Sequence, residues 1–299
     1  MHILITGATG LIGRQLCKAL LAAGHELTVL SRKPASVPDK CGTGVHAIAT
    51  FEEWYPSQTF DAVINLAGEP IADARWTDQR KRLLWVSRVK LTQDLVRHIA
   101  SAEHKPKVLL SGSAAGYYGH RSDVGLDEAS KAGNNFAARL CEAWEDAAQG
   151  AEQVGVRVCL LRTGLVLSNN GGLLARMLLP FKLGLGTRLG DGKQWMSWVH
   201  IDDYVGSVLR LLHDTQASGP YNMTAPQPAT NAEFTATLAK VLHRPALFVA
   251  PAPLLKLAMG ERACLLLEGQ HVLPGKISAA GYRFQFANLF DALSHLLRK

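Results

Sequence analysis

The sequence predicts an α/β fold in which a doubly wound parallel sheet carries a smaller carboxyl-terminal α+β lobe. Three observations predict it. Short apolar runs alternate with segments of helical periodicity over about the first 165 residues, a glycine-rich turn follows the first apolar run, and glycine-rich segments interrupt the alternation between residues 171 and 192. The 299 residues allow two domains of about 150 residues, or one large domain with an inserted lobe.

The alternation defines the expected sheet. The apolar run at residues 3–5 ends at Thr6 and Gly7, and apolar residues then recur at helical spacing from Leu11 to Ala23. Further strands are expected at residues 26–30, 45–49, 62–66, 108–110 and 156–161, and helices at about 77–100 and 135–149. Strand and helix alternate as in a parallel sheet with helices on both faces.

The rhythm changes after residues 162–164, where the lobe is expected to begin. Residues 201–212 predict a helix with Asp202 or Asp203 as its N-cap, and residues 220–223 predict a strand that returns to the sheet. Helices near residues 231–242, 254–258 and 289–297 are expected in a lobe over the carboxyl edge of the sheet.

Composition excludes several classes of protein. Hydrophobic residues make up 47% of the chain and charged residues 19%, which excludes disordered and low-complexity chains. The net charge of +7 is compatible with nucleic acid, an acidic membrane surface or a phosphorylated ligand. The densest basic stretch, residues 75–90, predicts an amphipathic helix whose cations face solvent or a ligand. Because no second basic element accompanies it, nucleic acid is not an expected partner.

The cysteines and the amino-terminal residues bear on the compartment. Five widely spaced cysteines argue against a disulfide framework and against a Cys-x-x-Cys site, which favours a reducing compartment. The first residues lack the basic start and apolar stretch of about 7 to 15 residues of a signal peptide, and no apolar segment reaches the roughly 18 residues of a membrane span. A cytoplasmic protein without a membrane partner is expected.

The sequence GATGLIG at residues 7–13 is placed between the first strand and the first helix. Glycines in this pattern permit a tight turn, close approach of a pyrophosphate and close packing of helix on strand, and the helix amino end offers free N–H groups. This context predicts a dinucleotide site in a Rossmann-like sheet.

The second strand ends in Leu30-Ser31-Arg32-Lys33, where a carboxylate would accept hydrogen bonds from the ribose hydroxyls of NAD. An Arg and a Lys match a 2′-phosphate instead, so NADP is the predicted cofactor. A solvated basic turn before Pro34 is the alternative. The residues expected to bind the cofactor are Gly7, Thr9, Gly10, Leu11, Ile12, Gly13, Ser31, Arg32, Lys33, Leu66, Ala67, Gly68, Glu69 and Arg162.

Taken with these motifs, NLAGEP at 65–70, SGSAAGYYG at 111–119, LRTG at 161–164 and WVHIDD at 198–203 resemble the extended or atypical short-chain dehydrogenase/reductases of the epimerase/dehydratase type. Nearly the whole chain resembles the bacterial YfcH-like proteins, called epimerase family proteins. The resemblance implies an NADP-binding domain at residues 1–165 plus about 200–225, and a substrate lobe at 166–199 and 226–299.

The Tyr-x-x-x-Lys pair of that superfamily, in which the Lys lowers the phenol pKa, is missing: none of the six tyrosines has a Lys four residues later. Phe136 and Leu140 stand roughly where the pair is expected. The resemblance leaves Ser113 and Tyr118 as candidate catalytic residues, with capping or backbone hydrogen bonding as the alternative role. Arg162 is expected to contact a cofactor phosphate or a substrate carboxylate.

The preferred hypothesis is an NADP(H)-binding oxidoreductase or epimerase-like protein that acts on a small or sugar-like hydroxyl or carbonyl substrate. The alternative is a cofactor-bound sensor without turnover, which the missing Tyr/Lys pair favours. The expected partner is a small-molecule substrate, and a homodimer is left open. The eleven histidines show no metal-ligand spacing, so no metal site is expected.

Overall fold

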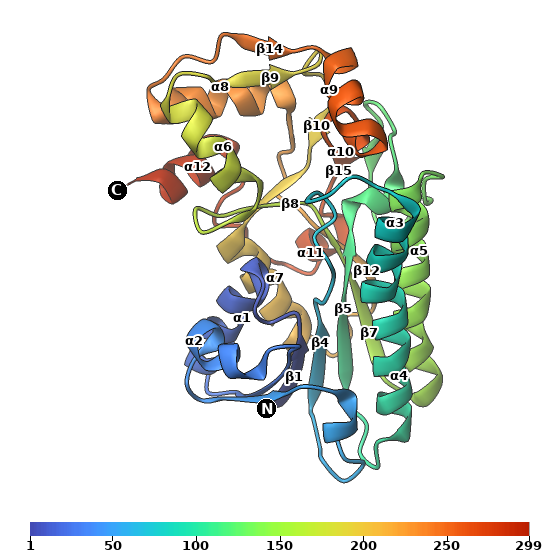
Figure 1. Cartoon of the computed structure of the whole chain (residues 1–299). Coiled ribbons are helices and arrows are strands. Elements are labelled where there is room, and N and C mark those ends of the chain that lie inside the picture. Colours follow the sequence, from blue (N-terminus) through green and yellow to red (C-terminus); the bar gives the residue numbers. More distant parts are fainter. Residues whose placement is uncertain (299) are drawn as a thin grey trace.

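A seven-stranded parallel sheet forms the centre of the molecule (Figure 1). The computed structural model describes residues 1–298. The strands lie in the order β3-β2-β1-β4-β5-β7-β12, which confirms the predicted doubly wound α/β fold. Successive strands are added toward one edge of the sheet from β1 to β3 and toward the other edge from β4 onward. The boundary between β1 and β4 is a topological switch point, beside which ligands bind in such folds. The strands are β1 (His2–Thr6), β2 (Glu26–Leu30), β3 (Val45–Ile48), β4 (Ala62–Asn65), β5 (Val108–Ala114), β7 (Arg157–Thr163) and β12 (Gly219–Met223).

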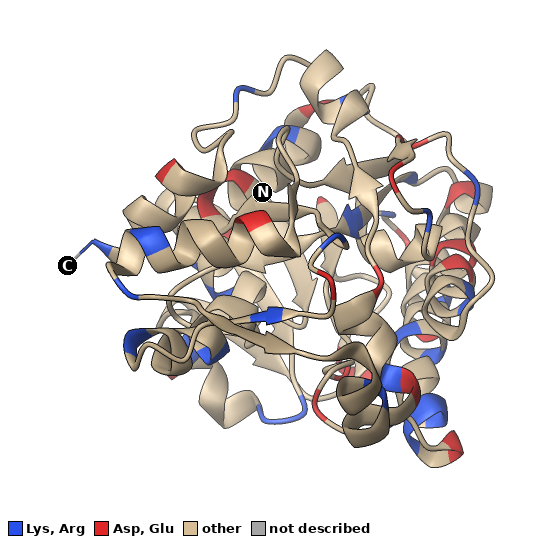
Figure 2. Ribbon diagram, turned by 90° about the horizontal axis from the view of Figure 1, so that it is seen from above, with Lys and Arg blue, Asp and Glu red and all other residues tan. Residues whose placement is uncertain are grey.

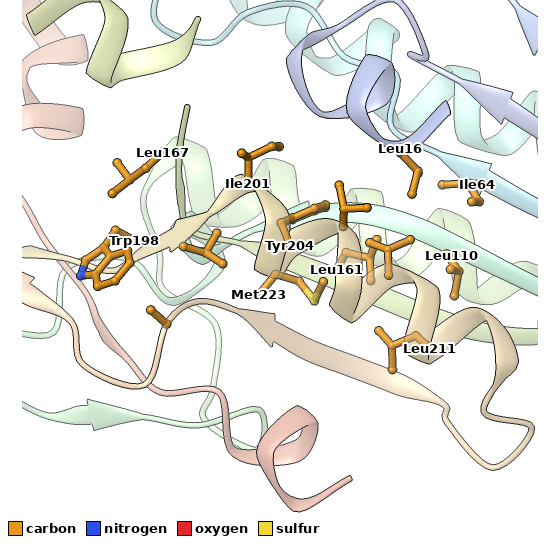
Figure 3. Packing of buried hydrophobic residues seen from close by; sticks show 14 of the residues in the cluster. Leu16, Ile64, Leu110, Leu161, Leu167, Trp198, Ile201, Tyr204, Leu211 and Met223 are labelled. Carbon is orange, nitrogen blue, oxygen red and sulfur yellow. The ribbon is translucent and has the colours of Figure 1, made fainter. Parts of the chain in front are cut away.

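Helices cover both faces of this sheet (Figure 1). The helices α1 (Leu11–Ala22), α2 (Val37–Cys41) and α7 (Ile201–His213) pack on one face, and α4 (Leu91–Ser101) and α5 (Phe136–Gln149) pack on the other. Successive residues of a strand point to opposite faces, so Ile3 of β1 joins the core beneath α1 and α7 while Leu4 joins the core beneath α4 and α5. Figure 3 shows Leu16 and Tyr204 in the first of these cores, with Leu161.

The helix predicted at residues 77–100 is divided into three parts. The helices α3 (Asp78–Trp85) and α4 are joined by a π-helical stretch, η3 (Val86–Lys90). Such wide turns occur where a helix must redirect side chains, and here Val86, Ser87 and Lys90 line a cleft described below. Apolar periodicity continues through the π-helical stretch, which is why the sequence pattern predicts one helix.

The lobe comprises the helices and short strand pairs above the carboxyl edge of the sheet (Figure 1). Its strand pairs are β8 (Leu165–Leu167) with β11 (Trp198–His200), β9 (Thr187–Leu189) with β14 (Phe248–Ala250), and β10 (Trp195–Met196) with β13 (Ala229–Thr230). Its helices are α6 (Gly172–Lys182), α8 (Asn231–Leu242), α9 (Ala252–Met259), α10 (Cys264–Leu267) and α12 (Leu289–Leu297). A further pair, β6 (Gly125–Leu126) with β15 (His271–Val272), and α11 (Gly275–Ala279) connect the lobe with β12.

The predicted N-cap of α7 is wrong. His200 caps this helix, because its Nδ1 accepts a hydrogen bond from the Asp202 backbone N–H (3.0 Å). Asp203 is buried and accepts from the Tyr282 hydroxyl and from the backbone N–H groups of Gln285 and Phe286. The partners of Asp203 are about 80 residues away in the chain, so local sequence could not indicate them.

The basic stretch at residues 75–90 does not simply face solvent or a ligand. Arg75 donates to the Ala258 carbonyl oxygen (2.7 Å), and Lys81 pairs with Glu261 (2.5 Å). Arg88 is part-buried and donates to the Glu69 carbonyl oxygen (2.8 Å). Much of the positive charge therefore holds the lobe and the loop after β4. Figure 2 shows Lys and Arg interspersed with Asp and Glu along the outer helices.

The apolar segments of the chain serve the cores of this fold. Within residues 1–298, every helix is too short or too polar to pass through a lipid bilayer. The cysteines Cys17, Cys41, Cys141, Cys159 and Cys264 are all thiols, and only Cys264 is not fully buried.

Candidate cofactor cleft and substrate cavity

The glycine-rich turn gives each of its three glycines a separate role. Gly7 has a φ of +72°, and a Cβ there would lie 2.5 Å from the backbone of Leu66. A Cβ at Gly13 would lie 2.5 Å from the Ala8 Cα, so the glycine lets α1 pack on the turn. A Cβ at Gly10 would meet only the Gly7 carbonyl oxygen, at 3.2 Å, on the cleft side. The protein backbone therefore leaves no room for a side chain at Gly7 or Gly13, whereas the space beside Gly10 opens into the cleft.

A cleft of about 1010 Å³ extends from this turn over the ends of β1, β2 and β4. Gly7, Thr9 and Gly10 line it, whereas Leu11, Ile12 and Gly13 form the first turn of α1. The first turn of α1 contains no acidic residue, and its leading backbone N–H groups have no intrahelical acceptor. Unpaired N–H groups and the helix dipole favour an anion at this point, as a pyrophosphate requires.

Cations gather where the second strand ends. Ser31, Arg32 and Lys33, which are predicted to bind the cofactor, line the cleft, and the Arg32 side chain is 89% exposed. Ser36 and Lys40 line the same end of the cleft. Sequence reasoning missed these two residues, because they lie on short helices, η1 (Pro34–Ser36) and α2, that apolar periodicity did not indicate. The group of cations fits a phosphate on the adenine ribose.

The opposite wall of the cleft is the segment after β4. The lining there includes Leu66, Ala67, Gly68 and Glu69, which are predicted to bind the cofactor. The Glu69 carboxylate accepts from Arg32 Nη1 across the cleft (2.9 Å). Glu69 therefore neutralises part of the charge of Arg32 at this end of the cleft.

A buried polar network holds the strand ends beneath the cleft. Asn65 accepts from the Thr6 hydroxyl (2.6 Å) and donates to the hydroxyls of Thr92 (2.8 Å) and Ser111 (3.1 Å). The Thr6 oxygen in turn accepts from the Ala67 backbone N–H (3.2 Å). The network fixes the backbone that forms the cleft wall, and sequence spacing did not indicate it because its members come from three strands and a helix.

The two candidate catalytic hydroxyls lie in another buried network. Ser113 donates to Glu145 (2.5 Å), while the Tyr118 hydroxyl donates to Asn222 (2.6 Å) and accepts from Arg162 (3.0 Å). Burial raises the pKa of the Tyr118 phenol to about 12, in spite of the Arg162 cation. A shift in this direction opposes proton transfer near neutrality. Neither Ser113 nor Tyr118 lines the cleft or the cavity described below.

Arg162 is placed differently from its prediction as a ligand contact. It is 4% exposed, forms a two-pronged ion pair with Glu145 (2.9 Å for each contact), and donates to the Glu128 carbonyl oxygen. Burial lowers an arginine pKa, but the hydrogen bonds and charge of Glu145 outweigh it and hold the pKa of Arg162 above its ordinary value. Arg162 lines neither the cleft nor the cavity, and its polar atoms are satisfied within the protein. We infer a structural role for it.

Helix α5 presents an apolar face where the resemblance implied a Tyr/Lys pair. Leu140 is 1% exposed and belongs to a cluster with Trp76 and Trp144, against which Phe136 packs. Tyr117 makes no such pair with Arg121, because Arg121 donates to backbone carbonyl oxygens of residues 118, 131 and 132. Helix α5 itself contains neither a Tyr nor a Lys, so it does not provide a Tyr/Lys pair.

A second cavity, of about 580 Å³, lies between the lobe and the carboxyl ends of β5 and β7. Ala114 and Thr163 line it from these strand ends, and Asn135 lines it from the start of α5. The lobe closes it from the other side with α6, the β9–β10 segment and α10. The cleft and this cavity therefore occupy one edge of the sheet, the cleft over β1, β2 and β4 and the cavity over β5 and β7.

A cluster of His200, Asp202 and His295 has side-chain donor atoms close together. His200 uses both ring nitrogens within the protein, since Nδ1 accepts from the Asp202 N–H and Nε2 lies 3.1 Å from His295 Nδ1. Burial lowers the pKa of His200. The cluster is explained by the cap of α7.

The model of the NAD-dependent epimerase/dehydratase family matches residues 3–224, and a domain of unknown function (DUF1731) matches residues 250–296. The chain belongs to the NAD-dependent epimerase/dehydratase family. An epimerase family protein of Staphylococcus aureus (strain MW2) is 39% identical over 297 residues, which cover 99% of each chain. One of Staphylococcus epidermidis is 37% identical and covers 99% of this chain and 98% of its own.

Solved structures of family members share the fold. The crystal structure of human epimerase family protein SDR39U1 (isoform 2) with NADPH covers 99% of both chains at 35% identity and a TM-score of 0.89. A nucleoside-diphosphate sugar epimerase from Corynebacterium glutamicum is 33% identical, with a TM-score of 0.76 over 99% of this chain and 58% of its own. The fold and the recognised resemblance to atypical short-chain dehydrogenase/reductases are thereby confirmed.

Proposed function

We propose that this family member binds NADP(H) and acts as an oxidoreductase or epimerase on a small hydroxyl or carbonyl substrate. The observation that carries the proposal is the pair of sites at one sheet edge: a phosphate-compatible cleft and, beyond it, a cavity over β5 and β7. Residues 1–165 and about 200–225 would hold the cofactor, and residues 166–199 and 226–299 would close over the substrate. The human relative crystallised with NADPH supports the choice of cofactor.

The residues of the cleft fit this dinucleotide. The N–H groups at the start of α1 would hold the pyrophosphate, Gly10 would give it room, and Arg32 and Lys33 would pair with the 2′-phosphate. The bound cofactor supplies hydride transfer. The chain contributes orientation and exclusion of water, since the lobe covers the reacting end of the cavity.

A cofactor-bound sensor without turnover is the second candidate. It is favoured by the apolar face of α5 and by the burial of Ser113 and Tyr118, which deprive the cavity of the predicted proton donors. The sensor would bind NADPH with similar affinity but would not consume it.

A screen of carbonyl compounds with NADPH, and of chiral alcohols with NADP⁺, separates these candidates. An oxidoreductase lowers the absorbance of the reduced nicotinamide, whereas an epimerase interconverts stereoisomers without net consumption, so chiral separation of the products accompanies the optical assay. We expect consumption or interconversion that is lost in Gly10→Val. NADPH binding without either reaction across the screen would favour the sensor, and absence of NADPH binding would refute both.

A further inference from the structure

We propose that the cavity over β5 and β7 takes a lipophilic carbonyl or alcohol substrate, with an alkyl or aryl body and without a diphosphate. This inference deepens the proposed function and rests on it for the reaction, but not for binding. It also separates this chain from the substrate named for the Corynebacterium relative.

The walls of the cavity are mainly apolar. Large apolar side chains line it from α6, the β9–β10 segment and α10, among them Leu173, Met177, Phe181, Leu189, Met196 and Leu265. At about 580 Å³ it is the size of a pocket for a small organic ligand. Burial of an apolar body against such walls is favourable by about 25 cal/mol per Å².

The polar side chains of the cavity are largely committed to the protein. Gln194 donates to the carbonyl oxygens of Leu189 and Leu266, and Ser197 donates to that of Gln270. Asn231 accepts from the Leu189 N–H. These groups shape the cavity and have little hydrogen-bonding capacity left for the many hydroxyls of a sugar.

Charge in the cavity does not suit a diphosphate. The lining contains one cation, Arg176, and one carboxylic residue, Glu268. Arg176 is already paired with Asp73 (2.6 Å) and its side chain is 64% exposed. Burial raises the pKa of the lining thiol Cys141 to about 12, which keeps it neutral. Two phosphate charges would lose hydration here without a cationic site to replace it.

The apolar lining also reaches the surface. Leu185, which follows α6, lines the cavity and is 51% exposed. A lipophilic molecule would therefore contact apolar side chains both at the entrance and inside. The polar end of such a molecule would lie toward Thr163, at the end of β7, and Asn135, at the start of α5, where the proposed reaction takes place.

Calorimetric titration of the protein, both alone and in the presence of NADP⁺, tests this assignment without turnover. The ligands are the linear 2-alkanones from pentan-2-one to nonan-2-one, with UDP-glucose as the polar comparison. Each added methylene should strengthen ketone binding about fourfold, the equivalent of about 0.8 kcal/mol. UDP-glucose should give no saturable binding.

Two variants on one helix locate the binding. Met177→Lys, on the cavity wall, should weaken nonan-2-one binding more than tenfold, and Met177→Leu should restore it. Leu179→Lys, on the exposed side of α6, should leave it unchanged. An affinity independent of chain length, equal effects of both lysine variants, or tighter binding of UDP-glucose would overturn the inference. NADPH affinity is measured separately and reports on the proposed function. If the protein binds the ketones as expected but does not bind NADPH, the proposed function is refuted and the assignment of the cavity stands.

Discussion

Arg32 is the residue on which the proposed preference for NADP(H) depends most, and its guanidinium also pairs with Glu69. Its guanidinium lies over the cleft, paired with Glu69, although a 2′-phosphate would offer it a doubly charged acceptor. Exposed ion pairs contribute about 0–1 kcal/mol, so exchanging Glu69 for a phosphate is favourable. The pair therefore does not oppose cofactor binding.

NADPH should bind more tightly than NADH, and Arg32→Asp combined with Lys33→Ser should reverse this order. Loss of the charge-assisted hydrogen bonds, about 1.5–3 kcal/mol each, predicts at least a tenfold loss of NADPH affinity. Calorimetric titration measures both cofactors, with Lys131→Ser on the surface as the control. Equal affinities of the unchanged protein would exclude a 2′-phosphate site.

Gly10→Val should abolish cofactor binding while the fold is retained, whereas Gly13→Val should prevent folding. The reason is the different space at each position: Gly10 has φ −75° and faces an open cleft, whereas a Cβ at Gly13 would lie 2.5 Å from the Ala8 Cα. Circular dichroism and NADPH titration report fold and binding. An unchanged dissociation constant in Gly10→Val would refute the role of this turn.

A catalytic role of Tyr118 and Ser113 stays a prediction from the sequence. Their burial away from the cleft and the cavity favours a structural role, and the same variants distinguish the two roles. Tyr118→Phe removes two buried hydrogen bonds and should lower the free energy of unfolding by about 1–3 kcal/mol, with little change in turnover by the folded protein. A proton donor would instead cost the rate about 10² to 10⁴-fold. Urea unfolding and turnover should be measured for Tyr118→Phe and Ser113→Ala, beside Phe136→Leu, whose packing cost is under roughly 1.5 kcal/mol. A rate loss of that size in a folded variant would contradict the structural role.

At the scale of elements, the start of α7 links secondary structure to pH. His200 is fully buried, so burial holds its pKa below the ordinary 6.5 even though Asp202 lies 3.6 Å away. Its neutral Nδ1 caps the helix. Protonation would remove this acceptor and place a charge in the core.

The free energy of unfolding should therefore fall as the pH drops below about 6.5, because the unfolded chain then binds a proton that the folded His200 does not. His200→Asn keeps a capping side chain and should flatten this slope. Denaturant titrations between about pH 5 and 7 measure it, with the exposed His104→Asn as the control. Equal slopes in both variants would show that His200 is not the responsible group.

At the scale of the whole molecule, contacts distant in sequence attach the lobe to the sheet domain. Asp203 of α7 holds residues 282–286, just before the final helix, through one hydroxyl and two backbone N–H groups. Lys81 and Arg75 hold α9 and the turn after it. The cavity over β5 and β7 depends on this attachment because much of its lining belongs to the lobe.

Asp203→Ala should lower the free energy of unfolding by about 3 kcal/mol or more, since it leaves two backbone N–H groups without their acceptor. The neighbouring Asp202→Ala, half exposed, should cost about 0.5 kcal/mol or less. Chemical denaturation followed by circular dichroism compares the two. Equal effects would mean that Asp203 contributes no more than a surface carboxylate.

The sequence by itself determined the succession of the main strands and helices along the chain, the glycine turn and the basic residues after β2. Apolar periodicity and turn chemistry are local properties of the chain. The sequence also determined the loss of the Tyr/Lys pair. Only the tertiary structure decided that Arg162 forms a buried ion pair with Glu145, that His200 rather than an aspartate caps α7, and that the second cavity is mainly apolar. Each of these depends on partners from distant segments, and burial alters the charge and hydrogen bonding of a side chain in a way that spacing along the chain does not encode.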